Sequence, residues 1–171
     1  INQCMSLAAT LTCHASVSRA LSYMGAQICC NVVLVLLLQA LVPGASPELG
    51  CHAPAGGASL GQAFAWEFLM TLLLILTVYA VAIGEPSFGN VGPFAIGLSV
   101  VAGAITAGQF GGGAMNPARI LGPAIVSGGC GSWAVAFTYV AAQMLAGAVA
   151  ALLSAPLYGT GLELGSWADA A

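Results

Sequence analysis

Long apolar runs dominate the sequence, and polar positions are confined to the short breaks between them. Each run is long enough for a transmembrane helix, which needs about 20 mostly apolar residues. The breaks are rich in glycine, proline and serine and have no periodicity, which is typical of loops. The predicted spans are residues 18–42, 63–83, 93–110 and 133–157.

Two further apolar pieces are too short to cross a bilayer. One lies within residues 1–17 and reads NQCMSLAATLT, and the other is NPARILGPAIV at 116–126. Each makes a helix of about 16 Å, roughly half of the hydrocarbon core. A half-length helix beside full spans indicates either a re-entrant segment or a buried core piece.

An internal repeat favours the re-entrant interpretation. The pair IN at 1–2 matches MN at 115–116, and YMGAQ at 23–27 matches YVAAQ at 139–143, with offsets of 114 and 116 residues. Three predicted crossings separate the two short helices, so these helices enter from opposite faces, as in inverted-topology repeats. The second repeat has two spans before its short helix and the first has none. We therefore expect two spans to be missing ahead of Ile1.

Composition supports an all-α membrane protein, with the lipid bilayer as its first partner. Sixty per cent of the residues are hydrophobic and 4% are charged, whereas a soluble domain has about 25% charged residues. The two basic residues and the net charge of −3 exclude nucleic acid as a partner, because phosphate binding needs clustered Lys and Arg. No P-loop or dinucleotide motif is present, and we expect no catalysis, cofactor or metal.

The chemistry concentrates at the start of the second short helix. Asn116 is a good N-cap, Pro117 suits the first helical position, and the positive end of the helix dipole lies there. Two such ends meeting in mid-membrane would repel cations and accept neutral hydrogen-bonding molecules. Arg119 follows directly. A charge inside a membrane is a functional candidate by default, although Arg119 could also snorkel or form a structural ion pair.

These residues make the chain resemble the aquaporin, or major intrinsic protein, family. Asn116-Pro117-Ala118-Arg119 follows a glycine-rich loop, and Asn2-Gln3-Cys4 is a degenerate copy of the same motif. RALSYMGAQ (19–27) and FAIGLSVVAGAITAGQF (94–110) extend the resemblance over nearly the whole chain. It implies an inverted-repeat bundle with two re-entrant half-helices, assembled as a homotetramer with one pore per subunit.

The resemblance implies a role for each motif residue. Asn2 and Asn116 are the expected pair at the pore centre, and Arg119, Ala104 and Gly113 are the expected walls of the narrow filter. The fourth wall belongs to a span that this chain lacks. Because Ala104 and Gly113 are small, we expect passage of water and of small neutral solutes such as ammonia, urea, hydrogen peroxide or glycerol. Glycerol facilitators resemble one another in carrying Asp directly after this arginine. This chain has Ile120 there, which argues against a dedicated glycerol channel.

Two departures from the motif lie in the first half-helix. Gln3 replaces proline, so we expect a slightly looser helix start. Cys4 replaces alanine, and if its thiol faces the lumen, mercury would block the pore.

Three polar residues within the spans are expected to be structural. The resemblance implies that Glu67 accepts backbone N–H groups from a re-entrant loop, and a transported-ion site is the alternative. Gln27 and Gln143 hold equivalent repeat positions and are interpreted as buried donors.

The six cysteines predict small buried residues rather than a disulfide framework. Cys29 and Cys30 are expected to be packing residues. Two Cys-His pairs, at 13–14 and 51–52, resemble halves of a zinc site. They lie on opposite sides of the first span, which argues against zinc.

The sequence therefore predicts a passive channel. One alternative is a non-conducting membrane subunit, because a chain without its first two spans could not close a lumen. A membrane enzyme using cysteine thiols is a weaker one. Arg19 is the one basic loop residue, and the positive-inside bias places the 1–19 side in the cytoplasm.

Overall fold

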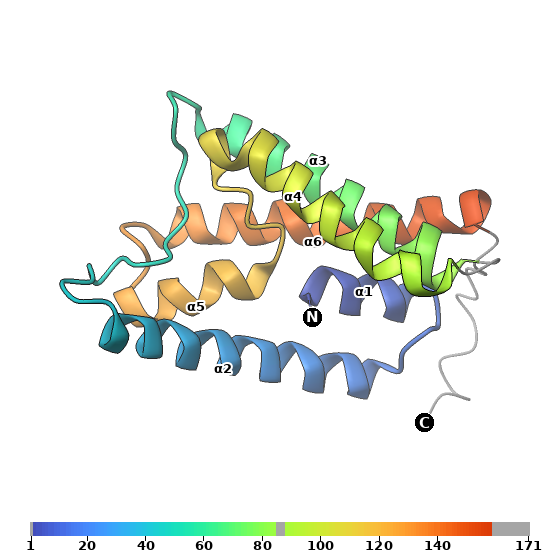
Figure 1. Ribbon diagram of the computed structural model, residues 1–171, viewed down its shortest axis with the longest axis horizontal. Helices are drawn as coiled ribbons and strands as arrows, with labels where there is room; N and C mark the ends of the chain where they lie inside the picture. Colours follow the sequence, from blue (N-terminus) through green and yellow to red (C-terminus); the bar gives the residue numbers. More distant parts are fainter. Residues whose placement is uncertain (1, 85–87, 159–171) are drawn as a thin grey trace.

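The described part of the chain is an all-α bundle of four long helices and two short ones. The computed structural model describes residues 2–84 and 88–158 (Figure 1), and no strand occurs among them. The single domain expected over 1–171 extends beyond this part of the chain. The helices are α1 (Gln3–Leu11), α2 (Val17–Leu41), α3 (Leu60–Val78, continued by a π-helical turn Tyr79–Ile83), α4 (Gly92–Gly111, preceded by a 3₁₀ turn Gly89–Val91), α5 (Pro117–Ser127) and α6 (Trp133–Tyr158).

Local sequence signals set the ends of these helices. Ser16 caps α2 by accepting from the amide of Arg19. Ser59 and Gln62 form a reciprocal capping box at the start of α3. The α4 helix ends at Gly112, whose φ of 91° is left-handed and favours glycine.

Small residues let the helices pack closely. The α3 helix packs against α4 and α6, α2 packs against α1 and α5, and both short helices also contact α6. Alanines line the buried face of α6, among them Ala142, Ala146 and Ala150. A Cβ atom on Gly147 would lie 2.8 Å from the Cys4 carbonyl oxygen. Such close approach of backbones is typical of helices packed within a membrane.

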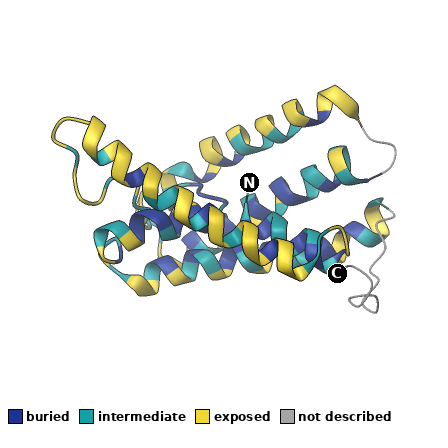
Figure 2. Cartoon of the chain, turned by 90° about the horizontal axis from the view of Figure 1, so that it is seen from below, coloured by how far each residue is buried: buried dark blue, intermediate teal, exposed yellow. Residues whose placement is uncertain are grey.

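The outer faces of the long helices are apolar. Ile105 is 75% exposed, and Leu41 and Phe94 are each 68% exposed. Exposed positions follow the outward sides of the helices, whereas buried positions face the interior (Figure 2). Exposed apolar stripes on four helices long enough to cross a bilayer are typical of lipid-facing surfaces. The protein is therefore an integral membrane protein, as predicted.

The two short helices point their N-terminal ends at each other near the middle of the bundle. They run away from this point in opposite directions (Figure 1). Asn2, at the start of α1, hydrogen-bonds the carbonyl of Met115, just before α5. Both helix N-termini thus meet at one place inside the protein.

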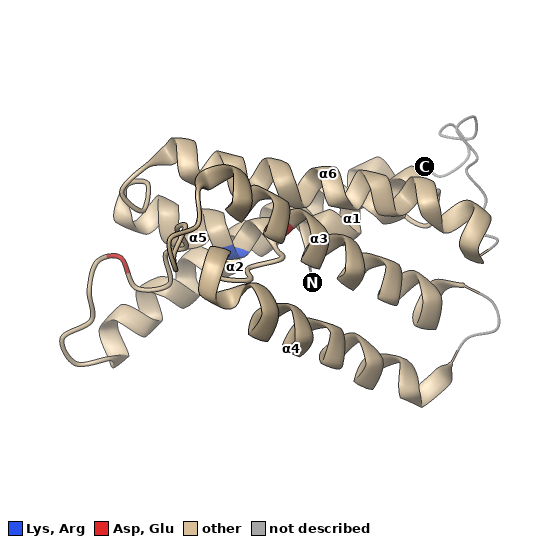
Figure 3. Ribbon diagram, turned by 90° about the horizontal axis from the view of Figure 1, so that it is seen from above, with Lys and Arg blue, Asp and Glu red and all other residues tan. Residues whose placement is uncertain are grey.

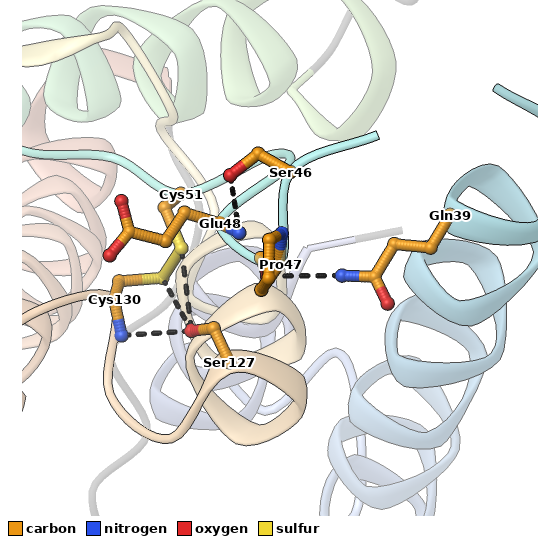
Figure 4. Close-up of a disulfide and its surroundings, with 7 residues drawn as sticks. All are labelled: Gln39, Ser46, Pro47, Glu48, Cys51, Ser127 and Cys130. Carbon is orange, nitrogen blue, oxygen red and sulfur yellow. Dashed lines mark hydrogen bonds between the residues drawn. A yellow bond between two sulfur atoms is a disulfide. The ribbon is translucent and has the colours of Figure 1, made fainter. Parts of the chain in front are cut away.

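The expectation of no disulfide is wrong, because Cys51 and Cys130 are joined across 79 residues of sequence (Figure 4). Their loops, after α2 and after α5, meet on one side of the bundle. Cys29 and Cys30 are exposed rather than packed inside. Cys4 is the one free cysteine in the described part of the chain that is buried.

Candidate functional site at the meeting point of the two short helices

Two asparagines cap the short helices in nearly the same way. Asn2 has φ −158° and ψ 127°, and Asn116 has φ −157° and ψ 115°. The Oδ1 atom of Asn2 accepts the amide of Cys4 at 3.0 Å, and that of Asn116 accepts the amide of Ala118 at 3.0 Å. Since each oxygen is held by its own helix, each NH₂ group is directed away from that helix.

The first half-helix has a capped start although glutamine replaces proline at position 3. Gln3 is only 3% exposed, and its Oε1 atom accepts the Ala118 amide at 2.6 Å. Proline would have supplied a fixed φ. Here the glutamine side chain supplies a hydrogen bond to the other short helix, and the Asn2 cap keeps its geometry.

A buried carboxylate holds the loop that leads into α5. Glu67 on α3 has no exposed surface, and it accepts the amides of Ala114 at 2.8 Å and Met115 at 2.9 Å. Gln143 on α6 donates a third bond to it at 2.7 Å. Charge-assisted bonds of this kind are strong. Met115 has φ 51°, a costly left-handed conformation for a non-glycine residue, which these contacts hold in place.

The two repeat-related glutamines have different surroundings. Gln143 is fully buried against Glu67. Gln27 donates at 3.5 Å to the Ser6 hydroxyl and lines a mainly apolar groove of about 580 Å³ between α1 and α2. Among the described residues, the second glutamine is therefore enclosed by the bundle, whereas the first borders a groove.

A smaller cavity of about 230 Å³ passes both asparagines and reaches Arg119. Its polar side consists of Asn2, Asn116 and Arg119. Its opposite side is apolar and comes from α3 and α4, namely Leu74, Ile75, Val78, Ile96 and Val100. Cys4 is absent from this lining and is fully buried. The condition for block by mercury, a Cys4 thiol that faces the lumen, is therefore not met at this cavity, because Cys4 packs beside Gly147 of α6.

Of the expected filter residues, Arg119 lines this cavity, whereas Ala104 and Gly113 lie against each other and are not among its lining residues. Arg119 donates through Nη1 to the Ala114 carbonyl at 3.3 Å and is otherwise exposed. A Cβ atom on Gly113 would lie 3.1 Å from the Cα atom of Ala104, so these two small walls touch. Gly113 also has φ 59°, which favours glycine. Charged residues are few along the whole described chain (Figure 3).

His52 is a polar residue near Gly112 and Arg119 that the sequence did not assign to the site. Its ring lies against Gly112, where an added Cβ would be 2.5 Å from His52 Cδ2. Burial, and next the positive charge of Arg119, lowers the pKa of the His52 imidazole below its ordinary 6.5. Its Nδ1 atom is buried. In the sequence, His52 stood out only as the partner of Cys51 in a Cys-His pair.

The loop that carries His52 is fastened at several points. Cys51 is bonded to Cys130, whose amide donates to the Ser127 hydroxyl at 2.9 Å (Figure 4). Ala55 donates its amide to the Phe110 carbonyl at 2.9 Å. The loop therefore crosses from the end of α5 to the end of α4 and holds His52 beside the filter residues.

Residues 1–158 match the family described as major intrinsic protein. The chain belongs to the major intrinsic protein family. Its relatives include aquaporin TIP4-1 of Arabidopsis thaliana, which is 33% identical over 156 residues, or 90% of this chain and 60% of that protein. Aquaporin TIP1-2 of Zea mays is 35% identical over 156 residues, 90% of this chain and 59% of that protein.

This major intrinsic protein chain spans about 60% of the length of the curated relatives it matches. Aquaporin TIP1-1 of Arabidopsis thaliana shows the same proportion, with 35% identity over 156 residues, 90% of this chain and 60% of that protein. The match includes both short helices and all four long ones. Membership in the family therefore rests on the whole described bundle.

Proposed function

We propose that the protein forms a passive transmembrane channel for water and small neutral solutes. The observation that carries this proposal is the meeting of two asparagine-capped helix N-termini at a cavity that leads to Arg119. A cavity of about 230 Å³ has room for a short column of water, given about 30 Å³ per molecule in the liquid.

The same geometry supports the exclusion of ions. The N-terminus of a helix carries about half a positive charge, and Arg119 adds a full one. No carboxylate is among the residues that line the cavity, and the oxygens of the nearby Glu67 are occupied by the Ala114 and Met115 amides, so no carboxylate ligand is offered to a cation. The apolar side from α3 and α4 offers no ligand to replace an ion's water, and desolvating a charge is costly. Neutral molecules need only the asparagine NH₂ groups and nearby carbonyls.

The residues near Arg119 bear on which small neutral solutes could pass besides water. Ala104 and Gly113 add little side-chain volume at the filter end. His52 adds a ring beside them, which limits the opening that they would otherwise leave. Ammonia, urea, hydrogen peroxide and glycerol are the solutes to test. Ile120 is buried in the packing of α5 and offers no polar contact to glycerol.

Orientation follows from two signals at opposite ends of α2. Arg19 lies near its first residue, and Cys51 lies in the loop beyond its last. Disulfides persist in oxidising compartments, and basic loop residues favour the cytoplasm. Both signals support a cytoplasmic α1–α2 connection and a Cys51–Cys130 bond on the opposite side.

Assembly as a homotetramer in the bilayer is part of the same proposal. It rests on the family resemblance and on the exposed apolar stripes of the long helices. Chemical cross-linking in native membranes tests it, with a four-subunit product as the expected result and a monomer alone as the contrary one.

The function is tested by the shrinkage of liposomes under an osmotic gradient, measured by light scattering. We expect vesicles with the full chain to shrink faster than empty vesicles, and Asn116→Leu to remove most of the difference. A non-conducting subunit, which is the alternative function, predicts equal rates for protein-containing and empty vesicles.

A further inference from the structure

We infer that Gln3 is a positioning residue that fixes Asn116 opposite Asn2, and thereby sets the selectivity of the central constriction. This inference rests on the proposed channel function. Two consecutive residues of α1's start hold the backbone on either side of the Asn116-Pro117 pair. Asn2 donates to the Met115 carbonyl at 2.6 Å, and Gln3 accepts the Ala118 amide at 2.6 Å.

Both ends of the Gln3 amide are used, and each binds a different helix. Its Oε1 atom accepts from Ala118 in the first turn of α5. Its Nε2 atom donates to the Met24 carbonyl of α2 at 3.5 Å. Since Gln3 belongs to α1 and is 3% exposed, one buried side chain joins α1, α2 and α5. A side chain that only filled space would not need two polar atoms, which are costly to bury unpaired.

The bond from Ala118 to Gln3 uses the first backbone donor of α5. Pro117 has no N–H group, so the Ala118 amide is the first amide within that helix. It is shared between Asn116 Oδ1 at 3.0 Å and Gln3 Oε1 at 2.6 Å. Gln3 therefore acts at the residue whose amide orients the Asn116 side chain.

The bond between Gln3 and Ala118 has no counterpart in the other half of the internal repeat. Position 3 corresponds to Pro117, which has no polar side chain to offer α1 in return. The α1 amide at the matching position, that of Cys4, is held by Asn2 at 3.0 Å. Gln3 thus adds to the Asn2–Met115 bond a second bond between the two short helices, and this bond has no counterpart from position 117.

Substitution of Gln3 should relax selectivity more than it slows water. Gln3→Met keeps the length of the side chain and removes both hydrogen bonds. Gln3→Asn keeps the amide but shortens its reach. Gln3→Glu keeps an acceptor for Ala118, which a helix N-terminus favours. We expect the first two variants to raise the ratio of urea to water permeability and Gln3→Glu to stay near the wild type.

Gln27→Met is the matched control. Gln27 is also a nearly buried glutamine, at 7% exposed, and its side chain donates to the Ser6 hydroxyl of α1. The same chemical change there should alter stability without altering the ratio.

The experiment measures two properties of the full chain. One is the NMR resonance of the Ala118 amide proton in lipid, which reports its hydrogen bond whether or not the protein conducts. The other is the urea-to-water permeability ratio in liposomes. We expect Gln3→Met and Gln3→Asn to move the resonance upfield and to raise the ratio about fivefold, the factor that matches one net hydrogen bond of about 1 kcal/mol.

Each outcome decides the inference. An unmoved Ala118 resonance in both Gln3→Met and Gln3→Asn overturns the hydrogen bond. A moved resonance with an unchanged ratio, or an equal rise in Gln27→Met, overturns the positioning role. If the wild-type protein conducts neither water nor urea, the proposed function fails, and with it the role in selectivity. The resonance then still decides whether Gln3 binds Ala118.

Discussion

Glu67 accepts the amide of Met115 at 2.9 Å and so holds a non-glycine residue at φ 51°. This contact joins the middle of α3 to the residue directly before Asn116. The same carboxylate accepts the Ala114 amide at 2.8 Å. The Ala114 carbonyl in turn accepts a hydrogen bond from Arg119. One buried side chain thus supports both the capping asparagine and the filter arginine.

Glu67→Gln should destabilise the protein, because the amide NH₂ group cannot accept a loop amide as a carboxylate oxygen does. Bonds to charged groups contribute about 1.5–3 kcal/mol each, so we expect a loss of that order for one bond. Thermal unfolding in detergent measures it. Glu48→Gln, in the exposed loop after α2, is the matched control and should leave the melting temperature unchanged. Equal effects at the two positions would contradict the role given to Glu67.

Gly112→Ala should displace His52. A Cβ atom there would lie 2.5 Å from the imidazole Cδ2, and the φ of 91° is itself unfavourable for alanine. We expect a loss of stability of about 1–3 kcal/mol from the backbone conformation alone, with the clash adding to it. Combining the change with His52→Ala should recover only the part due to the clash. Strict additivity of the two changes would show that the two residues do not touch.

Loss of the Cys51–Cys130 bond should free the loop over the filter. Removal of a disulfide that closes a long loop costs about 2–4 kcal/mol. We therefore expect a dithiol reductant, or Cys130→Ser, to lower the melting temperature of the protein. The Cys29→Ser/Cys30→Ser double variant should melt like the wild type and should keep its response to reductant. An unchanged melting temperature after reduction would contradict the bond.

The lowered pKa of His52 predicts how the loop responds to acid. Because burial and Arg119 disfavour the imidazolium more than the smaller influence of Glu67 favours it, the unfolded chain takes up the proton first. Stability is then complete above pH 6.5 and is lost as the pH falls below it toward the lowered pKa. His52→Gln should remove this part of the pH dependence of the melting temperature. A wild-type melting temperature that falls with acid no more than that of His52→Gln would contradict the assignment.

The fold and the site were predictable from the sequence to different extents. The long helices and the two short ones follow from apolar run length and from the N-P-A-R motif, which encode lipid contact and helix capping locally. The Cys51–Cys130 bond and the position of His52 could not be derived in this way. Both depend on which loops meet in space, and pairing of cysteines is not contained in their spacing.

The contact made by Gln3 could not be predicted for a related reason. The replacement of proline by Gln3 removes a local backbone preference, and that local argument predicted a looser helix. The compensating contact is with Ala118, 115 residues away in the sequence, and depends on how the half-helices meet. Cys4 shows the same limit, because the close approach of Gly147 decides that its thiol is buried.

The most direct test of the central claim is the osmotic water permeability of liposomes containing the full chain, measured together with proton flux. The account predicts fast shrinkage with no proton flux above that of empty vesicles. It also predicts a rise in proton or cation flux in Arg119→Ala, which removes the fixed charge beside the asparagine pair. Shrinkage no faster than that of empty vesicles, or proton flux through the wild-type protein, would contradict it.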